Sequence, residues 1–384
     1  MRDALGRFDC TRWLSAAALL AGLAPAVAAG QTAACPSTVS AAEAQYRAVI
    51  ATAEQLVCDS LLARIPGMQV AIAVDGKLVW SESFGFADLE RHVPVTRTTQ
   101  FRIGSVSKPL SAAAVAMLVE QGQLDLDAPV QRYVPYFPQK PWPITTRQAA
   151  GHLAGIRHYR GDEFMLNRPF ASVRDGLTIF ENDSLLFEPG TRFSYSSYGW
   201  NLVSAVIEGA SGDLFLAYVS QNVLLPLGLT HTAPDRADSL IPDRTRFYDA
   251  DSTGTAFRPA AAVDNSYKWA GGGFLSTAED LVRFGSAFVR PGFFKAETLD
   301  LLFTTQRTRT GDPTGYGIGW FVTTDTLGHR WVFHGGGSVG GTTAFGVDRD
   351  SRIVFAVTTN LTEAPLAATR RIMRLFDAAV SSAP

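Results

Sequence analysis

Strand-forming sequence is concentrated at the two ends of the 384-residue chain, and helical or loop-rich sequence lies between about residues 125 and 286. Residues 68–74 and 77–84 form two strand-like runs joined by Asp75-Gly76, which is a strong signal for a β-hairpin. In the last hundred residues, strand patterns return before a helical pattern, at 316–323, 331–334, 342–347, 353–359 and then 363–379. The two ends are therefore predicted to close one α/β sheet domain around a helical insertion.

Composition places the chain among ordinary globular proteins. It is 46% hydrophobic and 18% charged, with a formal net charge of −2, which suits one large domain or two. Lysine is scarce and the sequence has no run of five basic residues, so a phosphate-binding surface is disfavoured. We expect no nucleic-acid partner.

The N-terminus has the layout of a secretory signal peptide. Arg2, Arg7 and Arg12 precede the apolar stretch at 14–29, which ends in small residues around Ala28. The stretch is shorter than the roughly 20 residues that a membrane-spanning helix needs. We expect cleavage near Ala28, no stable membrane span afterwards, and export to the periplasm or the extracellular space; an uncleaved anchor is the alternative.

Export would leave two of the three cysteines, Cys35 and Cys58, in an oxidising compartment. A disulfide between them would tie the new N-terminus to a helix predicted at 41–63 from its apolar spacing; two unpaired thiols are the alternative. Residues 32–35 resemble a lipoprotein cleavage box, but Thr32 replaces its usual large apolar residue, which disfavours lipid attachment.

The run Ser105-Val106-Ser107-Lys108 predicts a nucleophile with its own base. It opens a helical pattern over 106–121, so Ser105 and Lys108 would lie one turn apart on the same face. A lysine amine there can take the proton that a serine loses when it attacks a carbonyl. The free N–H groups and positive dipole of the first helical turn favour both a developing oxyanion and a neutral lysine.

Two further segments carry polar groups suited to the same chemistry. A tyrosine of the hydroxyl-rich segment 187–199 can share a proton relay with a nearby lysine, whose charge lowers the phenol pKa. The apolar run at 331–333 ends in His334 and three glycines, whose bare backbone would let a substrate pair along a strand edge. The N–H groups of Gly337 and Ser105 would form an oxyanion hole. Turn and capping chemistry is the alternative for the first segment, and a glycine-rich turn for the second.

Other polar residues predict supporting roles only. His152 is expected within a helix, packing or hydrogen-bonding under the site, and residues 267–269 either line the cleft or hold its loop. The cysteines have no ligand-type neighbours and no His-x-x-x-His pair occurs. We therefore expect no metal and no organic cofactor.

The order of these motifs, SxxK, then a tyrosine motif, then a H/K-x-G strand, resembles class C β-lactamases, penicillin-binding proteins and related peptidase S12-like serine hydrolases. The runs at 133–135, 151–159 and 264–277 look most like the mitochondrial serine β-lactamase-like proteins and their bacterial relatives. The resemblance implies an α/β (α+β) fold of the β-lactamase/transpeptidase type, with a five-stranded antiparallel sheet flanked by helices. The chain would divide into a signal peptide at 1–29, an N-terminal segment and helix at 30–64, and a hydrolase domain at 65–380.

Residue by residue, the resemblance makes Ser105 the acylated nucleophile and Lys108 its base. Tyr195 matches the tyrosine of the Y-x-N motif, and His334 with Gly336 matches the H/K-x-G strand. Two departures concern substrate binding: Ser197 stands at the asparagine position, and His334 stands where many drug-hydrolysing members have lysine.

These departures disfavour efficient penicillin hydrolysis while leaving acyl transfer intact. The expected activity is that of a peptidase or amidohydrolase on a small-molecule or peptide substrate. An esterase or a β-lactamase on the same machinery is the alternative, and a non-catalytic module that binds a peptide or wall fragment is the alternative of another class. The oligomeric state is left open.

Overall fold

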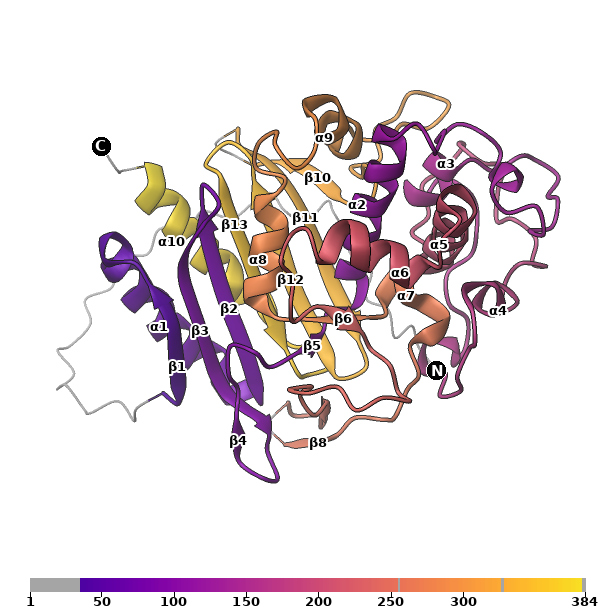
Figure 1. Ribbon diagram of the computed structural model, residues 1–384. Coiled ribbons are helices and arrows are strands. Elements are labelled where there is room, and N and C mark those ends of the chain that lie inside the picture. The colour runs from indigo at the N-terminus through magenta and orange to yellow at the C-terminus, as the bar shows by residue number, and fades with distance from the viewer. Residues whose placement is uncertain (1–34, 255, 326–327, 382–384) are drawn as a thin grey trace, which may run out of the picture. The chain divides into compact units, whose positions relative to one another are not determined.

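The computed structural model describes residues 35–254, 256–325 and 328–381, which belong to one compact unit (Figure 1). The predicted signal peptide, the lipoprotein-like box before Cys35, and Cys10 lie outside the described residues. Cys35 and Cys58 form a disulfide, the pairing that the sequence favours.

The central feature is an antiparallel sheet with strand order β1-β3-β2-β13-β12-β11-β10, to which β4 adds by pairing with β3. Its strands are β1 Ser37–Ala42, β2 Gly67–Val74, β3 Lys77–Asp88, β4 Val93–Pro94, β10 Phe321–Thr324, β11 Arg330–Ser338, β12 Gly341–Asp348 and β13 Ile353–Thr359. The expected five strands are the inner set from β3 to β11. The number five is wrong for the whole sheet, because β1, β4 and β10 extend it to eight strands.

The hairpin of β2 and β3 confirms the Asp75-Gly76 signal. Asp75 has φ 50° and Gly76 has φ 81°, the left-handed pair that a tight two-residue hairpin requires. Pairing of β2 with β13, from Val74 opposite Ile353 to Met68 opposite Thr359, joins the two ends of the chain in one sheet, as the sequence predicted.

The two faces of the sheet bury different sets of side chains, because alternate residues of a strand point to opposite sides. On β13, Ile353, Phe355 and Val357 join the core formed with α1 and α10. Val354 and Ala356 join the larger core that contains residues of α2, α5 and α8. Helices therefore cover both faces, with α8 packed on β13 and β2.

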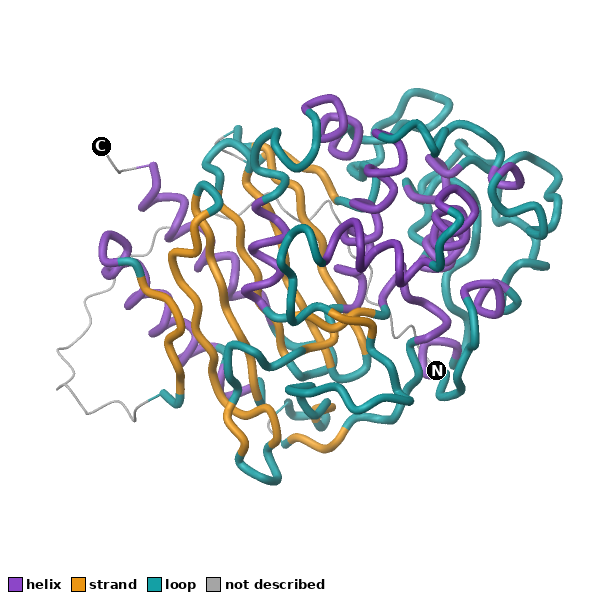
Figure 2. Tube along the Cα trace, in the orientation of Figure 1, coloured by secondary structure: helices purple, strands orange, loops and turns teal. Residues whose placement is uncertain are grey.

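Figure 2 separates the strands of the sheet from the helical and loop-rich segment between α2 and α9. The α-helices are α1 Arg47–Ser60, α2 Ser107–Glu120, α3 Thr146–Ala150, α4 Val173–Leu177, α5 Ser197–Ser211, α6 Phe215–Val219, α7 Trp269–Gly272, α8 Ala278–Ser286, α9 Ala296–Phe303 and α10 Thr369–Ser381. Short 3-10 turns are η1 Ala44–Tyr46, η2 Leu62–Arg64, η3 Gly104–Val106, η4 Val130–Arg132, η5 Glu163–Met165, η7 Ser266–Lys268 and η8 Leu366–Ala368, and η6 Ser220–Leu224 is a π-helix.

Two small sheets accompany the large one. A three-stranded sheet has the order β5 Phe101–Arg102, β9 Phe274–Ser276 and β6 Ala233–Pro234, and a two-stranded sheet pairs β7 Tyr248–Ala250 with β8 Phe257–Pro259. Among the described helices, none alone is long and apolar enough to cross a membrane, although α5 taken together with α6 and η6, bent by 78°, reaches the required length and hydropathy.

Three predicted elements have wrong boundaries. The helix expected at 363–379 begins only at Thr369, because residues 366–368 form the 3-10 turn η8. The helix expected at 41–63 begins only at Arg47, because residues 37–42 pair with β3 as an edge strand. The strand expected at 316–323 is shortened to β10, since Gly319 has φ 81° and turns the chain just before the strand.

Candidate active site

Ser105 lies in the short connection between the small three-stranded sheet and helix α2. β5 leads into η3, which begins at Gly104 with φ 50°. A Cβ atom on Gly104 would collide with the carbonyl oxygen of Gly337 on β11, so only glycine allows this approach at a positive φ. The contact fixes the start of the SxxK helix against the glycine segment of the strand.

Lys108 is fully buried and its amine contacts three oxygen atoms. Nζ lies 3.0 Å from Ser105 Oγ, 3.1 Å from Ser197 Oγ and 2.7 Å from the carbonyl oxygen of Gly271 in α7. The side chain has 0% exposure. The structure thus brings together the two residues that the helical spacing placed on one face.

A second buried lysine, Lys268, acts on the electrostatics of the first. Burial lowers the pKa of Lys108 well below its ordinary value, and the positive charge of Lys268 lowers it further. Burial and the charge of Arg102 lower the pKa of Lys268 itself to about 7, against the opposite effect of Asp235. The Lys268 Nζ atom lies 4.4 Å from the ring centroid of Phe164 and 5.1 Å from that of Tyr267.

Tyr195 lies beside this pair, with its ring centroid 4.8 Å from Lys108 Nζ. Burial raises the pKa of its phenol above the ordinary value, and contacts with the Ser105 and Ser197 side chains offset only part of this effect. The expectation that the lysine charge lowers this pKa is therefore wrong in sign, because desolvation of the phenolate dominates. Tyr195 is a neutral phenol at pH 7.

His334 on β11 is buried and uncharged. Its Nδ1 atom lies 2.7 Å from the Gly335 carbonyl oxygen and its Nε2 atom 3.1 Å from the Tyr316 hydroxyl. A proton on Nδ1 leaves Nε2 to accept from Tyr316. Burial, and then the charge of Lys108, lowers the pKa of His334 to about 3, so this side chain offers no positive charge to a substrate.

The glycines after His334 lie within a strand, so the alternative of a glycine-rich turn is wrong. Gly337 pairs with Thr342 of β12. On the other side, β10 pairs with residues 330–333 of β11, and the described strands leave residues 334–338 open along that edge. Gly335 and Gly337 are exposed, and a Cβ on either would meet no described heavy atom within 4 Å.

The chain is similar to known proteins over most of its length. The family model described as Beta-lactamase matches residues 53–379. The chain belongs to the beta-lactamase family. It is 33% identical over 369 residues to the human "Serine beta-lactamase-like protein LACTB, mitochondrial", an alignment that covers 72% of this chain and 67% of the relative.

Two other members of the beta-lactamase family extend the comparison. The "Penicillin-binding protein 4*" of Bacillus subtilis is 28% identical, over 70% of this chain and 62% of that protein. The solved structure of the octameric penicillin-binding protein homologue from Pyrococcus abyssi has a TM-score of 0.72 and 25% identity, and covers 86% of this chain and 77% of that one. The β-lactamase/transpeptidase-like fold is therefore confirmed, and the protein is a hydrolase of the serine type.

Within this beta-lactamase family site, Ser197 takes the place expected for the Y-x-N asparagine and still contacts Lys108. Ser196 caps α5 by accepting the Gly199 N–H at 3.1 Å, and the Ser197 N–H donates to His158 Nδ1 at 3.1 Å. The Ser197 side chain also contacts the Tyr159 phenol and partly offsets the rise in its pKa caused by burial. Ser197 thus contacts both Lys108 and a second tyrosine.

Sequence reasoning missed Tyr159 and His158 as neighbours of Ser197, and gave Lys268 no electrostatic role. Tyr159 and His158 occur in the sequence only within a run used for the resemblance, and no spacing rule links them to the SxxK helix. His152 supports the site as expected, since its Nδ1 accepts the Ser196 N–H at 3.1 Å. Its position within a helix is wrong, because His152 follows α3 in a turn with φ 61°.

Gly336 gives a test of how the glycine strand holds the nucleophile. A Cβ on Gly336 would collide with the Ile103 carbonyl, two residues before Ser105. We expect Gly336→Ala to lower the free energy of unfolding by about 1–3 kcal/mol, the usual cost of overpacking. Because the substitution displaces η3, it should also slow the covalent labelling of Ser105 by a fluorophosphonate probe. Gly335→Ala, which meets open space, is the matched control. Equal melting temperatures and labelling rates for the two variants would contradict this packing.

Proposed function

We propose that the protein is an exported serine hydrolase that forms an acyl-enzyme on Ser105 and hydrolyses an amide or ester bond, most readily in a peptide or other amide. The observation that carries the proposal is the 3.0 Å contact between Ser105 Oγ and the Nζ atom of the fully buried Lys108. Because burial lowers the pKa of Lys108, the amine is available in the neutral form that a general base requires.

In acylation, the lone pair of the Lys108 amine accepts the Ser105 proton. The two amine hydrogens are directed to Ser197 Oγ and the Gly271 carbonyl oxygen, at 3.1 Å and 2.7 Å. As the proton leaves, Ser105 Oγ forms a bond to the carbonyl carbon of the substrate. The three contacts of Nζ thus match one acceptor and two donor functions of a neutral amine.

The remaining steps use the strand edge and the neutral phenol. The backbone N–H groups of Ser105 and Gly337 hold the negative oxygen of the tetrahedral intermediate. The C–N or C–O bond then breaks, and the leaving group takes the proton from Lys108 through the Tyr195 hydroxyl. A water molecule that gives its proton to the same relay attacks the ester, releases the acid and restores Ser105.

The state of His334 supports amide or ester substrates over penicillins. With a pKa lowered to about 3, this histidine is neutral and cannot attract a substrate carboxylate as a lysine would. Export is supported by the basic and apolar N-terminal sequence. The mitochondrial location printed for the human relative describes that protein.

The direct test is the intact mass of the purified protein after incubation with a fluorophosphonate probe, with benzylpenicillin, and with short peptide amides and esters. We expect one probe adduct per chain, turnover of an amide or ester, and slow or no loss of benzylpenicillin. No adduct and no turnover of any of these compounds would favour the non-catalytic binding module instead.

Lys268 gives the proposal a pH signature. The acylation rate should rise with pH as Lys108 loses its proton and then level off. Lys268→Met removes a neighbouring positive charge, which raises the pKa of Lys108 and shifts the rising limb to higher pH. The difference in labelling rate between Lys268→Met and the wild type should become small above pH 7, because Lys268 itself is neutral there in the wild type. The measurement is the labelling rate from pH 5 to 9.

The same substitution has an effect on stability with a defined sign. The pKa of Lys268 falls from 10.5 to about 7 on folding, so the buried lysine destabilises the fold fully below pH 7 and not at all well above pH 10.5. Lys268→Met should therefore melt at a higher temperature at pH 7. Lys77→Met, at an exposed lysine paired with Glu43, is the control for both measurements. If the rising limb of the labelling rate against pH were unshifted in Lys268→Met, Lys268 would have no part in the mechanism.

A further inference from the structure

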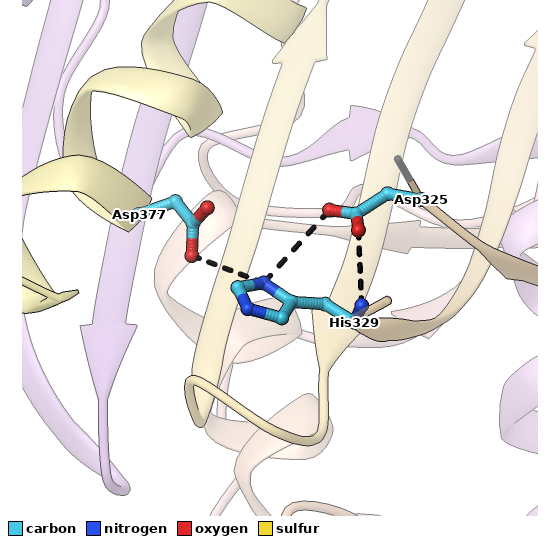
Figure 3. A group of neighbouring side chains, drawn as sticks. All are labelled: Asp325, His329 and Asp377. Carbon is cyan, nitrogen blue, oxygen red and sulfur yellow. Dashed lines mark hydrogen bonds and ion pairs between the residues drawn. The ribbon is translucent and has the colours of Figure 1, made fainter. Parts of the chain in front are cut away.

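A second cluster of ionisable groups lies at the start of β11, away from the glycine segment. Asp325 follows β10, His329 precedes β11, and Asp377 comes from α10. Figure 3 shows the His329 ring between the two carboxylates, with Nδ1 directed to both. Nδ1 lies 3.8 Å from Asp325 Oδ2 and 3.5 Å from Asp377 Oδ1, and the three ligand-type atoms lie within 4.8 Å of one another.

A buried carboxylate points into the same cluster. Asp348, the last residue of β12, is 0% exposed, and its Oδ2 atom lies 3.3 Å from His329 Nδ1. Its Oδ1 atom accepts the N–H groups of Asp350 and Ser351 at 2.9 Å and 3.1 Å. Oδ2 has no hydrogen-bond partner among the described residues. A buried carboxylate oxygen in this state is costly unless a positive group compensates it.

Protein groups alone compensate this charge poorly. Three carboxylates surround one imidazole nitrogen, which carries at most one proton and can donate it to one oxygen. Trp331 Nε1 and Ser351 Oγ also donate hydrogen bonds to Asp325 and Asp377, at 3.3 Å and 2.8 Å, but these donors are neutral. The nearby Arg330 pairs directly with Asp350, with its Nη2 atom 2.6 Å from Oδ1, and acts on Asp348 only through its charge.

We propose that this cluster binds a divalent first-row metal ion, such as Mn²⁺ or Zn²⁺. Asp325, His329 and Asp377 would supply direct ligands, and Asp348 the buried charge that completes the site. Carboxylates with one imidazole suit these ions better than Ca²⁺ or Mg²⁺, which prefer oxygen ligands alone. Ligands at about 2.1 Å from a metal lie about 3–4.2 Å apart, so ligand atoms that lie within 4.8 Å of one another need only small adjustments.

The site would be structural rather than catalytic. It joins α10 to the connection between β10 and β11 and to the end of β12, three parts of the last sixty residues. His334 follows His329 by five residues of extended chain, which spans about 17 Å at 3.3 Å per residue. A metal ion here would fix the strand that carries the glycine edge without touching the substrate.

The first test is a titration of the full chain with Mn²⁺ at pH 7.5, followed by the electron paramagnetic resonance signal of free Mn²⁺. We expect one ion bound per chain, displaced by Zn²⁺, and at least tenfold weaker binding in His329→Gln and in Asp377→Asn. Asp238→Asn, at an exposed carboxylate paired with Arg236, should bind as the wild type does. Circular dichroism checks that each variant is folded.

A second measurement needs no substitution. His329 is 24% exposed, so diethyl pyrocarbonate can reach it, and peptide mass spectrometry reports its modification. Mn²⁺ or Zn²⁺ should protect His329 at least tenfold while the exposed His92 reacts unchanged. Absence of stoichiometric binding, binding that survives both His329→Gln and Asp377→Asn, or equal modification of His329 with and without metal would each overturn the proposal and leave a proton-bridged ion cluster.

Discussion

Ser105→Ala is expected to abolish covalent labelling by the fluorophosphonate probe and all turnover. The reason is that the nucleophilic oxygen is removed while its surroundings are kept: Lys108 retains its contacts with Ser197 and Gly271. Because Ser105 is only partly buried, the substitution should leave the melting temperature close to that of the wild type. Intact mass after incubation with the probe measures the effect directly.

Ser107→Ala is the matched control, two residues along the same segment. The Ser107 hydroxyl is fully buried and accepts the Phe274 N–H at 3.2 Å, so it cannot meet a substrate. This variant should keep its adduct and lose stability, by about 1–3 kcal/mol for the unpaired N–H. An adduct that persists in Ser105→Ala would remove Ser105 from the mechanism.

Lys108→Met is expected to slow acylation by about 10²–10⁴-fold, the usual contribution of a positioned general base. Methionine approximates the length of the side chain but has no proton acceptor for Ser105. The residual labelling should also lose the rising pH limb, because the group that titrates there is gone. Stopped-flow or quenched labelling from pH 5 to 9 separates these two effects.

A purely structural role of Lys108 would give a different result from its role as a general base. The Ser197 hydroxyl and the Gly271 carbonyl lose a donor in Lys108→Met, so some loss of stability is expected. If labelling became slow but kept the wild-type pH dependence, Lys108 would only support the fold. A rate within tenfold of the wild type would assign the base to another group, of which Tyr195 is the nearest candidate.

The parts of the fold predicted correctly are those specified by local sequence. Asp75-Gly76 determines a hairpin through its backbone conformation, and the apolar run at 353–359 coincides with β13. The edge strand β1 could not be predicted, because residues 37–42 are mostly exposed and become a strand only by pairing with β3. The same holds for β10, whose pattern continues beyond the turn at Gly319.

The candidate site likewise contains residues that local sequence places and residues that only packing places. Ser105 and Lys108 are three residues apart, and helical geometry alone places them together. Lys268, Tyr159 and the Gly271 carbonyl arrive from distant segments that have no fixed spacing to the SxxK motif. Their positions depend on packing, and the sign of the Tyr195 pKa shift depends on burial, which a sequence pattern does not report.

The antiparallel pairing of β2 with β13 has a consequence for biosynthesis. During translation, Ser105 and Lys108 emerge long before the glycine edge on β11. The sheet cannot close until Thr359 has been made to pair with Met68. A nascent or truncated chain that ends before residue 330 holds Ser105 and Lys108 but has no strand along which to align a substrate. In the proposed mechanism, hydrolytic competence is therefore acquired late, when the last hundred residues complete the fold.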